Sequence, residues 1–367
     1  MLRSLEIQNY RNLRHLTIEK LGRVNLLVGK NNTGKTSVLE AATLLLHKAN
    51  PQWLYRILEI RGEIGYGSYG SEDEYLKINL SAISNLFYGR KGTFDPEEGI
   101  KIQQGLTDFS DDADVLLLRF ASFIEEIDET LGRVSRIEIN DDLDGNSKIG
   151  LDIATTTGAR IVSLDRRLGR SVAFSGLKDN IQFIRTNEIV RDTNGLLWDK
   201  ITLTPKQEFI IDSLGIIEPK IESLNFVAGL KRDDRRPVIK IKGSLLPIPL
   251  GSMGDGINRI LTIILAMVNC ENGYLLIDEF ENGLHYSVQE KLWEVIFYLA
   301  ERLDIQVFAT THSLDCVEAF STVLNDGKQD KKAAVMIRLE NYEGNIEATV
   351  YDADEIQATT RVNVDPR

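Results

Sequence analysis

Eight residues from position 29 to position 36 have the types and spacing that bind phosphate. They read Gly-Lys-Asn-Asn-Thr-Gly-Lys-Thr, the Walker A pattern, and they lie between an expected strand, Val24–Val28, and an expected helix that runs to about Lys48. In such a loop the backbone amides and the helix N-terminus bind phosphate oxygens, the lysine reaches the terminal phosphates, and the last hydroxyl binds magnesium. The expected nucleotide contacts are Asn31, Asn32, Thr33, Gly34, Lys35, Thr36 and Ser37.

Two carboxylates follow an apolar segment in the last third of the chain. The segment from Tyr274 to Ile277 predicts a buried strand, and Asp278 and Glu279 come directly after it. In an open α/β sheet the carboxyl ends of the strands face the ligand crevice. We therefore expect Asp278 to hold magnesium together with Thr36, and Glu279 to polarise the attacking water. An exposed turn is the other interpretation of such a pair, and the phosphate loop argues against it.

A second apolar strand, expected over Gln306–Ala309, leads into a polar loop that contains His312. A single histidine is most often structural, but this one follows the strand after the carboxylate pair. We expect His312 to hydrogen-bond the γ-phosphate and to be catalytic with Glu279 and Lys35.

A third loop, from Ser252 to Gly256, precedes a helix expected over Ile257–Val268. Its amides and the Ser252 hydroxyl could form an anion site at the helix N-terminus or serve only as a helix cap. We include Ser252 and Gly254 among the candidate nucleotide contacts.

Strands and helices must bring these loops together. Alternating strands and helices in the last third of the chain, including a helix over Ser287–Leu303, predict a parallel sheet and an α/β fold. The central region differs in character and resembles an inserted α+β region. Its expected elements are helices over Val115–Leu131 and Lys206–Leu224 and strands over Val134–Ile139, Ile149–Ala154 and Arg160–Leu164. Other expected strands are Leu2–Gln8, Leu16–Glu19 and Tyr75–Leu80.

Composition limits the class of protein. The chain has 367 residues, 43% of them hydrophobic, and a formal net charge of −12, which argues against indiscriminate nucleic-acid binding. A small basic group at Lys231, Arg232, Arg235 and Arg236 is interrupted by acidic residues and is interpreted as a solvated loop or a local nucleic-acid contact. The longest apolar run is too short to span a membrane. The two cysteines, Cys270 and Cys316, lie beside apolar runs, which suits a reducing cytoplasm.

The order of these motifs resembles the ABC-ATPase superfamily. The segments from Leu5 to Leu13 and from Ser37 to Ala41 resemble its RecF, SMC and OLD branch, and the last third is most similar to stand-alone, OLD-like AAA-type ATPases of bacteria. The resemblance implies a P-loop ABC-ATPase head with a mostly parallel sheet, flanking helices and an antiparallel β subdomain. We divide the chain into two parts of the head, 1–92 and 246–345, an inserted α+β region, 93–245, and a tail, 346–367.

The resemblance also implies how two copies would bind ATP. Ser252 and Gly254 would contact ATP bound to the opposite subunit of a head-to-tail homodimer, and Asn282–His285 would form the D-loop. Tyr10 and Arg11 would lie near the nucleotide. The signature Ser-Met-Gly-Asp departs from the usual Ser-Gly-Gly-Gln, and none of Gln52, Gln103 and Gln104 can be assigned to a Q-loop.

Two functions remain open at this point. In the first, ATP hydrolysis gates or drives a partner such as a nuclease in DNA repair or phage defence. Only about twenty residues follow Ala348, too few for a TOPRIM domain, so the nuclease would be another chain. In the second, ATP assembles a scaffold or sensor with little turnover. The N-terminal strand pattern disfavours a transporter subunit.

Overall fold

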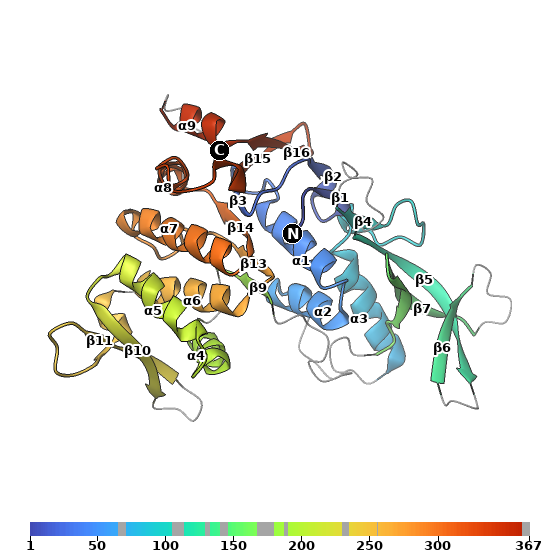
Figure 1. The fold of residues 1–367 in the computed structure, drawn as a ribbon. Helices are drawn as coiled ribbons and strands as arrows, with labels where there is room; N and C mark the ends of the chain where they lie inside the picture. The colour runs from blue at the N-terminus through green and yellow to red at the C-terminus, as the bar shows by residue number, and fades with distance from the viewer. Residues whose placement is uncertain are drawn as a thin grey trace.

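The computed structural model describes residues 1–64, 71–104, 114–128, 133–139, 146–166, 180–186, 190–229, 235–254 and 256–361. A six-stranded sheet forms its centre, in the order β16-β15-β3-β14-β13-β9 (Figure 1). Its strands are β3 (Val24–Val28), β9 (Ile181–Ile184), β13 (Tyr274–Ile277), β14 (Gln306–Thr311), β15 (Ala334–Tyr342) and β16 (Asn345–Tyr351). All neighbouring pairs are parallel except β15 with β16. Every residue of β3 and β14 is buried, as expected for strands covered on both faces.

Helices and a second sheet cover the two faces of this central sheet. Leu26 and Leu27, neighbours in β3, belong to different hydrophobic clusters because successive strand residues point to opposite faces. The cluster that contains Leu26 includes residues of α4 (Val190–Ile201), α5 (Lys206–Ile217), α6 (Gly256–Asn269), α7 (Tyr286–Arg302) and α8 (Leu314–Leu324). The cluster that contains Leu27 includes residues of α1 (Lys35–Leu46), α2 (Pro51–Ile60) and the antiparallel sheet.

The antiparallel sheet has seven strands in the order β2-β1-β4-β5-β7-β8, with β6 paired to β5. Their bounds are β1 (Leu5–Tyr10), β2 (Leu13–Ile18), β4 (Ile100–Gln103), β5 (Val115–Asp128), β6 (Arg133–Glu138), β7 (Lys148–Thr155) and β8 (Gly158–Ser163). Residues 93–245 thus contribute strands to both sheets of the head, since β4 to β8 extend the sheet begun by β1 and β2, and β9 lies beside β13. Strands β10 (Ile221–Ala228), β11 (Arg235–Ile241) and β12 (Ile248–Pro249) form a separate sheet. The expected strands at Leu2, Leu16, Val134, Ile149 and Arg160 are present with shifted ends.

Three of the expected elements were wrong. The run Val115–Leu131, predicted as a helix, forms strand β5 where the structure describes it, with Leu116 and Leu118 buried and Leu117 38% exposed between them. The strand predicted over Tyr75–Leu80 lies inside helix α3 (Glu72–Ser84), whose first turn is capped by the Ser71 hydroxyl accepting from the Glu74 amide.

The third error concerns the helix predicted over Lys206–Leu224. It ends at Ile217, and the residues from Ile221 onward form β10. Pro219 explains the break, because proline disfavours helical geometry in the residue before it. Ile221 and Leu224 are buried all the same, on a strand instead of a helix.

Candidate nucleotide-binding site

The glycine-bounded loop joins β3 to α1, as the sequence predicts. Gly34, just before the helix, has φ +86°, and a Cβ there would lie 2.8 Å from the Leu13 Cδ2, so both conformation and space favour glycine. The Lys35 ammonium donates to the carbonyls of Gly29 (2.6 Å) and Lys30 (2.8 Å). Burial lowers the pKa of Lys35, while the nearby carboxylates of Asp278, Glu281 and Glu279 oppose that shift.

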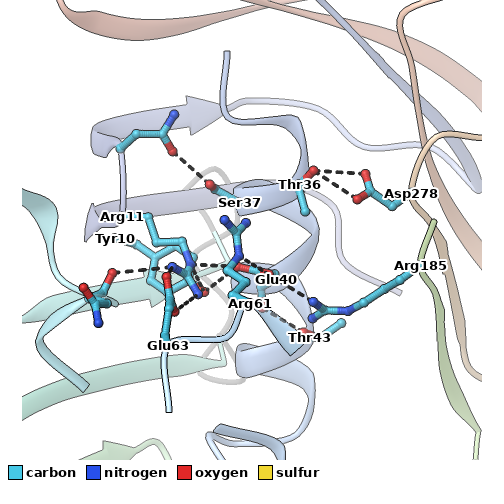
Figure 2. A network of polar contacts seen from close by, with 12 residues as sticks. Tyr10, Arg11, Thr36, Ser37, Glu40, Thr43, Arg61, Glu63, Arg185 and Asp278 are labelled. Atoms are coloured by element: carbon cyan, nitrogen blue, oxygen red, sulfur yellow. Dashed lines mark hydrogen bonds and ion pairs between the residues drawn. The ribbon is translucent and has the colours of Figure 1, made fainter. Parts of the chain in front are cut away.

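Asp278 lies at the carboxyl end of β13, between two threonine hydroxyls. The Thr36 Oγ1 donates to both carboxylate oxygens at 3.1 Å (Figure 2). The Thr310 Oγ1, at the end of β14, donates to Oδ1 at 2.7 Å. Burial raises the pKa of Asp278, although these hydrogen bonds oppose the shift. A hydroxyl and a carboxylate this close fit Mg²⁺, which binds proteins through one or two carboxylates and completes its shell with phosphate oxygens and waters.

Glu279 adopts a left-handed backbone conformation, with φ +49°. Its amide donates to the Thr310 Oγ1 at 2.9 Å, and the Phe280 amide donates to the Thr310 carbonyl at 2.9 Å. Thr310 therefore connects the two neighbouring strand ends and holds this turn in place. The partly buried Glu279 carboxylate lines the same cleft as Thr36 and Asp278.

A single cleft of about 980 Å³ contains most of the predicted site residues. Those that line it are Asn31, Asn32, Thr33, Gly34, Lys35, Thr36, Ser37, Asp278, Glu279 and His312. Its wall also includes Arg11, as the resemblance implies, and Arg61, Glu63 and Arg90. The cleft thus combines an amide-rich loop and several cations with a hydroxyl–carboxylate pair that could hold a metal, an arrangement suited to a polyphosphate and a divalent cation.

Ser252 and Gly254 do not line this cleft, although the structure describes both. They are exposed, and the Ser252 Oγ donates to the Pro249 carbonyl at 2.7 Å. Asp255 lies outside the described residues. In the segment expected as the D-loop, His285 caps α7 by accepting from the Ser287 amide at 3.3 Å. The residues of this segment, all described, do not line the cleft.

A buried carboxylate that sequence reasoning missed supports the cleft wall (Figure 2). Glu40 on α1 is fully buried and pairs with Arg11 (2.8 Å), Arg61 (2.9 Å) and Arg185 (3.3 Å). Arg11 also pairs with Glu63 at 2.8 Å. A lone glutamate in an otherwise apolar helix was the available signal, since a buried charge requires a partner. Spacing along the chain does not identify its partners, because Arg61 lies 21 residues away and Arg185 lies 145 residues away.

The other candidates from the sequence that the structure describes do not line the cleft. Gln52, Gln103 and Gln104, all described, are absent from its lining, and the Gln103 side chain donates to Glu6 at 2.6 Å. Of the basic group, Lys231 and Arg232 lie outside the described residues, and the Arg235 guanidinium pairs with Asp199 at 3.0 Å.

The fold and the site define a P-loop ATPase head of the ABC type, in its RecF and SMC branch. The chain belongs to the family described as "AAA domain, putative AbiEii toxin, Type IV TA system", whose model matches residues 24–317.

Curated relatives and a solved structure are consistent with this family. The chain is 24% identical to an "ATP/GTP phosphatase" of Helicobacter pylori, over 89% of each chain. It is 26% identical to the "DNA replication and repair protein RecF" of Clostridioides difficile, over 93% of this chain and 96% of that protein. An Smc head crystallised with the C-winged helix domain of ScpA has a similar fold, with TM-score 0.50 and 12% identity over 96% of this chain and 98% of that one. Within the described part of the chain, none of the helices has the length and apolar character needed to cross a membrane.

Proposed function

We propose that this protein hydrolyses ATP with Mg²⁺ and that ATP joins two copies head to tail. The observation that carries the proposal is the convergence of Thr36, Asp278 and Glu279 on the cleft formed by the phosphate loop. Thr36 begins the helix after β3, whereas Asp278 and Glu279 follow β13, 242 residues later for Asp278, yet one cleft contains the groups that phosphoryl transfer to water requires.

Each residue of this set has a distinct role in the proposal. Lys35 and the loop amides bind the phosphates, and Thr36 and Asp278 would hold Mg²⁺. When bound, this ion neutralises charge that develops on the phosphate oxygens. Glu279 orients a water and accepts its proton as the water attacks the γ-phosphorus, while the bond from that phosphorus to the ADP oxygen breaks. His312 donates a hydrogen bond to a γ-phosphate oxygen.

The exposed position of Ser252 and Gly254 supports the second part of the proposal. Neither residue lines the cleft of its own copy and both are exposed, as contact with the nucleotide of a second copy requires. Closure on ATP and reopening after hydrolysis would then gate a partner in the cytoplasm. A separate nuclease chain in DNA repair or phage defence is the partner class we propose, and the relative named as a DNA replication and repair protein supports a link to DNA.

The catalytic assignment is tested by separating the two carboxylates. Glu279→Gln keeps the shape of the side chain but removes the carboxylate that acts as the base. The rate of single-turnover hydrolysis should therefore fall by roughly 10²-fold or more, while the affinity for ATP is retained. Asp278→Asn should weaken Mg²⁺-dependent ATP binding as well as turnover. Glu290→Gln, an exposed carboxylate on α7, is the matched control and should behave as wild type. Wild-type hydrolysis by Glu279→Gln would exclude the proposed base.

The assembly step is tested by sedimentation of Glu279→Gln with ATP, which should form a dimer. Adding Ser252→Arg should prevent dimer formation, because it places bulk and charge in the closed interface. A double variant that dimerises as well as the single variant would contradict the sandwich. ATP-dependent dimerisation of wild type without phosphate release would instead support the scaffold function.

A further inference from the structure

Glu281 makes two contacts with His312 that the proposed mechanism leaves without a function. Its Oε1 accepts from the His312 backbone amide at 2.9 Å and lies 3.1 Å from the ring Nδ1. The Glu281 side chain is only 12% exposed, whereas the His312 side chain is 51% exposed and lines the cleft. One carboxylate oxygen therefore holds both the backbone and the ring of a residue that faces the nucleotide cleft.

The backbone around Glu281 is fixed by its neighbours. Phe280 is fully buried and stacks on Trp293, with ring centroids 4.1 Å apart and planes 10° from parallel. The Phe280 amide donates to the Thr310 carbonyl, and the Leu284 amide donates to the Glu281 carbonyl, each at 2.9 Å. The carboxylate is thus presented to His312 from a rigid turn, which makes a defined ring orientation possible.

We propose that Glu281 is a positioning residue that sets the tautomer and the ring orientation of His312. This inference rests on the proposed ATPase function for its catalytic meaning. With Nδ1–H donating to the carboxylate, Nε2 is directed away from Glu281. Because Nδ1 carries a proton in this arrangement, an Nε2–H that donates to a phosphate oxygen belongs to the doubly protonated ring, whereas the neutral Nδ1–H tautomer has no proton on Nε2 to donate.

Other charged groups lie in the same part of the molecule. Lys35, Asp278 and Glu279 line the cleft with His312, and Asp315 lies in the first turn of α8. Glu281 contacts the ring directly, with its Oε1 3.1 Å from Nδ1, so its removal should change the tautomer.

Two variants test the contact with Nδ1. Glu281→Gln retains an oxygen that accepts from Nδ1–H and should keep the tautomer. Glu281→Ala removes the acceptor and should lose the fixed tautomer. Nitrogen-15 NMR of the imidazoles reports the tautomer, and the chain has only four histidines, so His312→Gln assigns the signal. Glu290→Gln is the control and should leave the His312 signal unchanged.

Kinetics supply the second measurement. Loss of a carboxylate that orients a functional histidine costs roughly 10- to 100-fold, so Glu281→Ala should slow single-turnover hydrolysis by about this factor. The double variant with His312→Ala should be no slower than His312→Ala alone, because both changes remove the same function. Glu281→Asp should partly restore the rate if Glu281→Ala folds poorly.

Two results would overturn the inference: an unchanged His312 tautomer in Glu281→Ala, or multiplicative losses in the double variant. If wild type does not hydrolyse ATP, the proposed function fails, and the NMR result alone decides whether Glu281 controls His312.

Discussion

Replacing Glu40 with glutamine should destabilise the nucleotide-free protein strongly. Glu40→Gln keeps nearly the same volume but removes a negative charge that three guanidinium groups share. The Tyr10 hydroxyl also donates to this carboxylate at 3.2 Å. A buried charge that loses its partner is poorly solvated, and breaking such pairs costs about 3–5 kcal/mol.

The contacts of the three arginines narrow this range. Arg11 retains Glu63, and the Arg61 side chain is 33% exposed and can be hydrated. Arg185 is 8% exposed, and among the described residues its ion pair is with Glu40 alone. Because one of the three cations loses its partner fully, we expect the lower end of the range, about 3 kcal/mol.

Equilibrium unfolding in urea measures the effect. Glu63→Gln is the matched control, since it removes a less buried partner of Arg11 and should cost about 1 kcal/mol or less. Combining Glu40→Gln with Arg185→Met should cost less than the sum of the single changes, because no unpaired cation remains. A Glu40→Gln protein within about 0.5 kcal/mol of wild type would refute the reasoning, since that is the range of ordinary surface substitutions.

Three further predictions concern the site and the core. Lys35→Ala should abolish tight ATP binding while circular dichroism remains unchanged, because a charge-assisted phosphate contact is lost from an accessible loop; calorimetry measures the affinity. Asp278→Asn should raise the melting temperature of the nucleotide-free protein near pH 7. Burial raises the pKa of Asp278, so wild type loses stability as the pH rises from the ordinary aspartate pKa through this raised value and the buried carboxyl becomes charged. At pH values below the ordinary aspartate pKa the carboxyl is neutral in both states, and the difference in melting temperature between variant and wild type should vanish. Burial also raises the pKa of Cys270 and Cys316, so both thiols should resist a thiol reagent until the protein unfolds in denaturant.

The helices and strands in the last third of the chain were predicted well because the pattern of apolar residues in each of them fits only one type of secondary structure. Strand β13 has the predicted bounds, and α6 and α7 differ from prediction by one residue at each end. Helix α7 has seventeen residues, which is long enough to show the helical period. The four apolar residues of β13 are followed directly by two carboxylates, and this pattern is typical of a buried strand that ends at a ligand site.

The central region was predicted less well because short apolar runs are compatible with both the helical period of about 3.6 residues and the strand period of two residues. The consecutive residues Leu116, Leu117 and Leu118 fit an apolar segment of either a helix or a strand, and in the structure this segment pairs with β4 and β7 as a strand. The helix that replaced the strand over Tyr75–Leu80 had a signal, because Ser71 followed by Glu74 is a capping-box pattern.

The sequence by itself determined the class of protein and the groups that can do its chemistry. The phosphate loop, the Asp278–Glu279 pair and His312 are local patterns, and each takes its meaning from the strand or helix beside it. Only the tertiary structure decided which distant groups act on them. The pairing of Glu40 with Arg185 depends on how α1 packs beside the end of β9, and that of Glu281 with His312 on how the ends of β13 and β14 lie together. The partner of a buried or catalytic charge is the group that the fold brings next to it. That group can come from a distant segment, so the spacing of residues along the chain does not identify it.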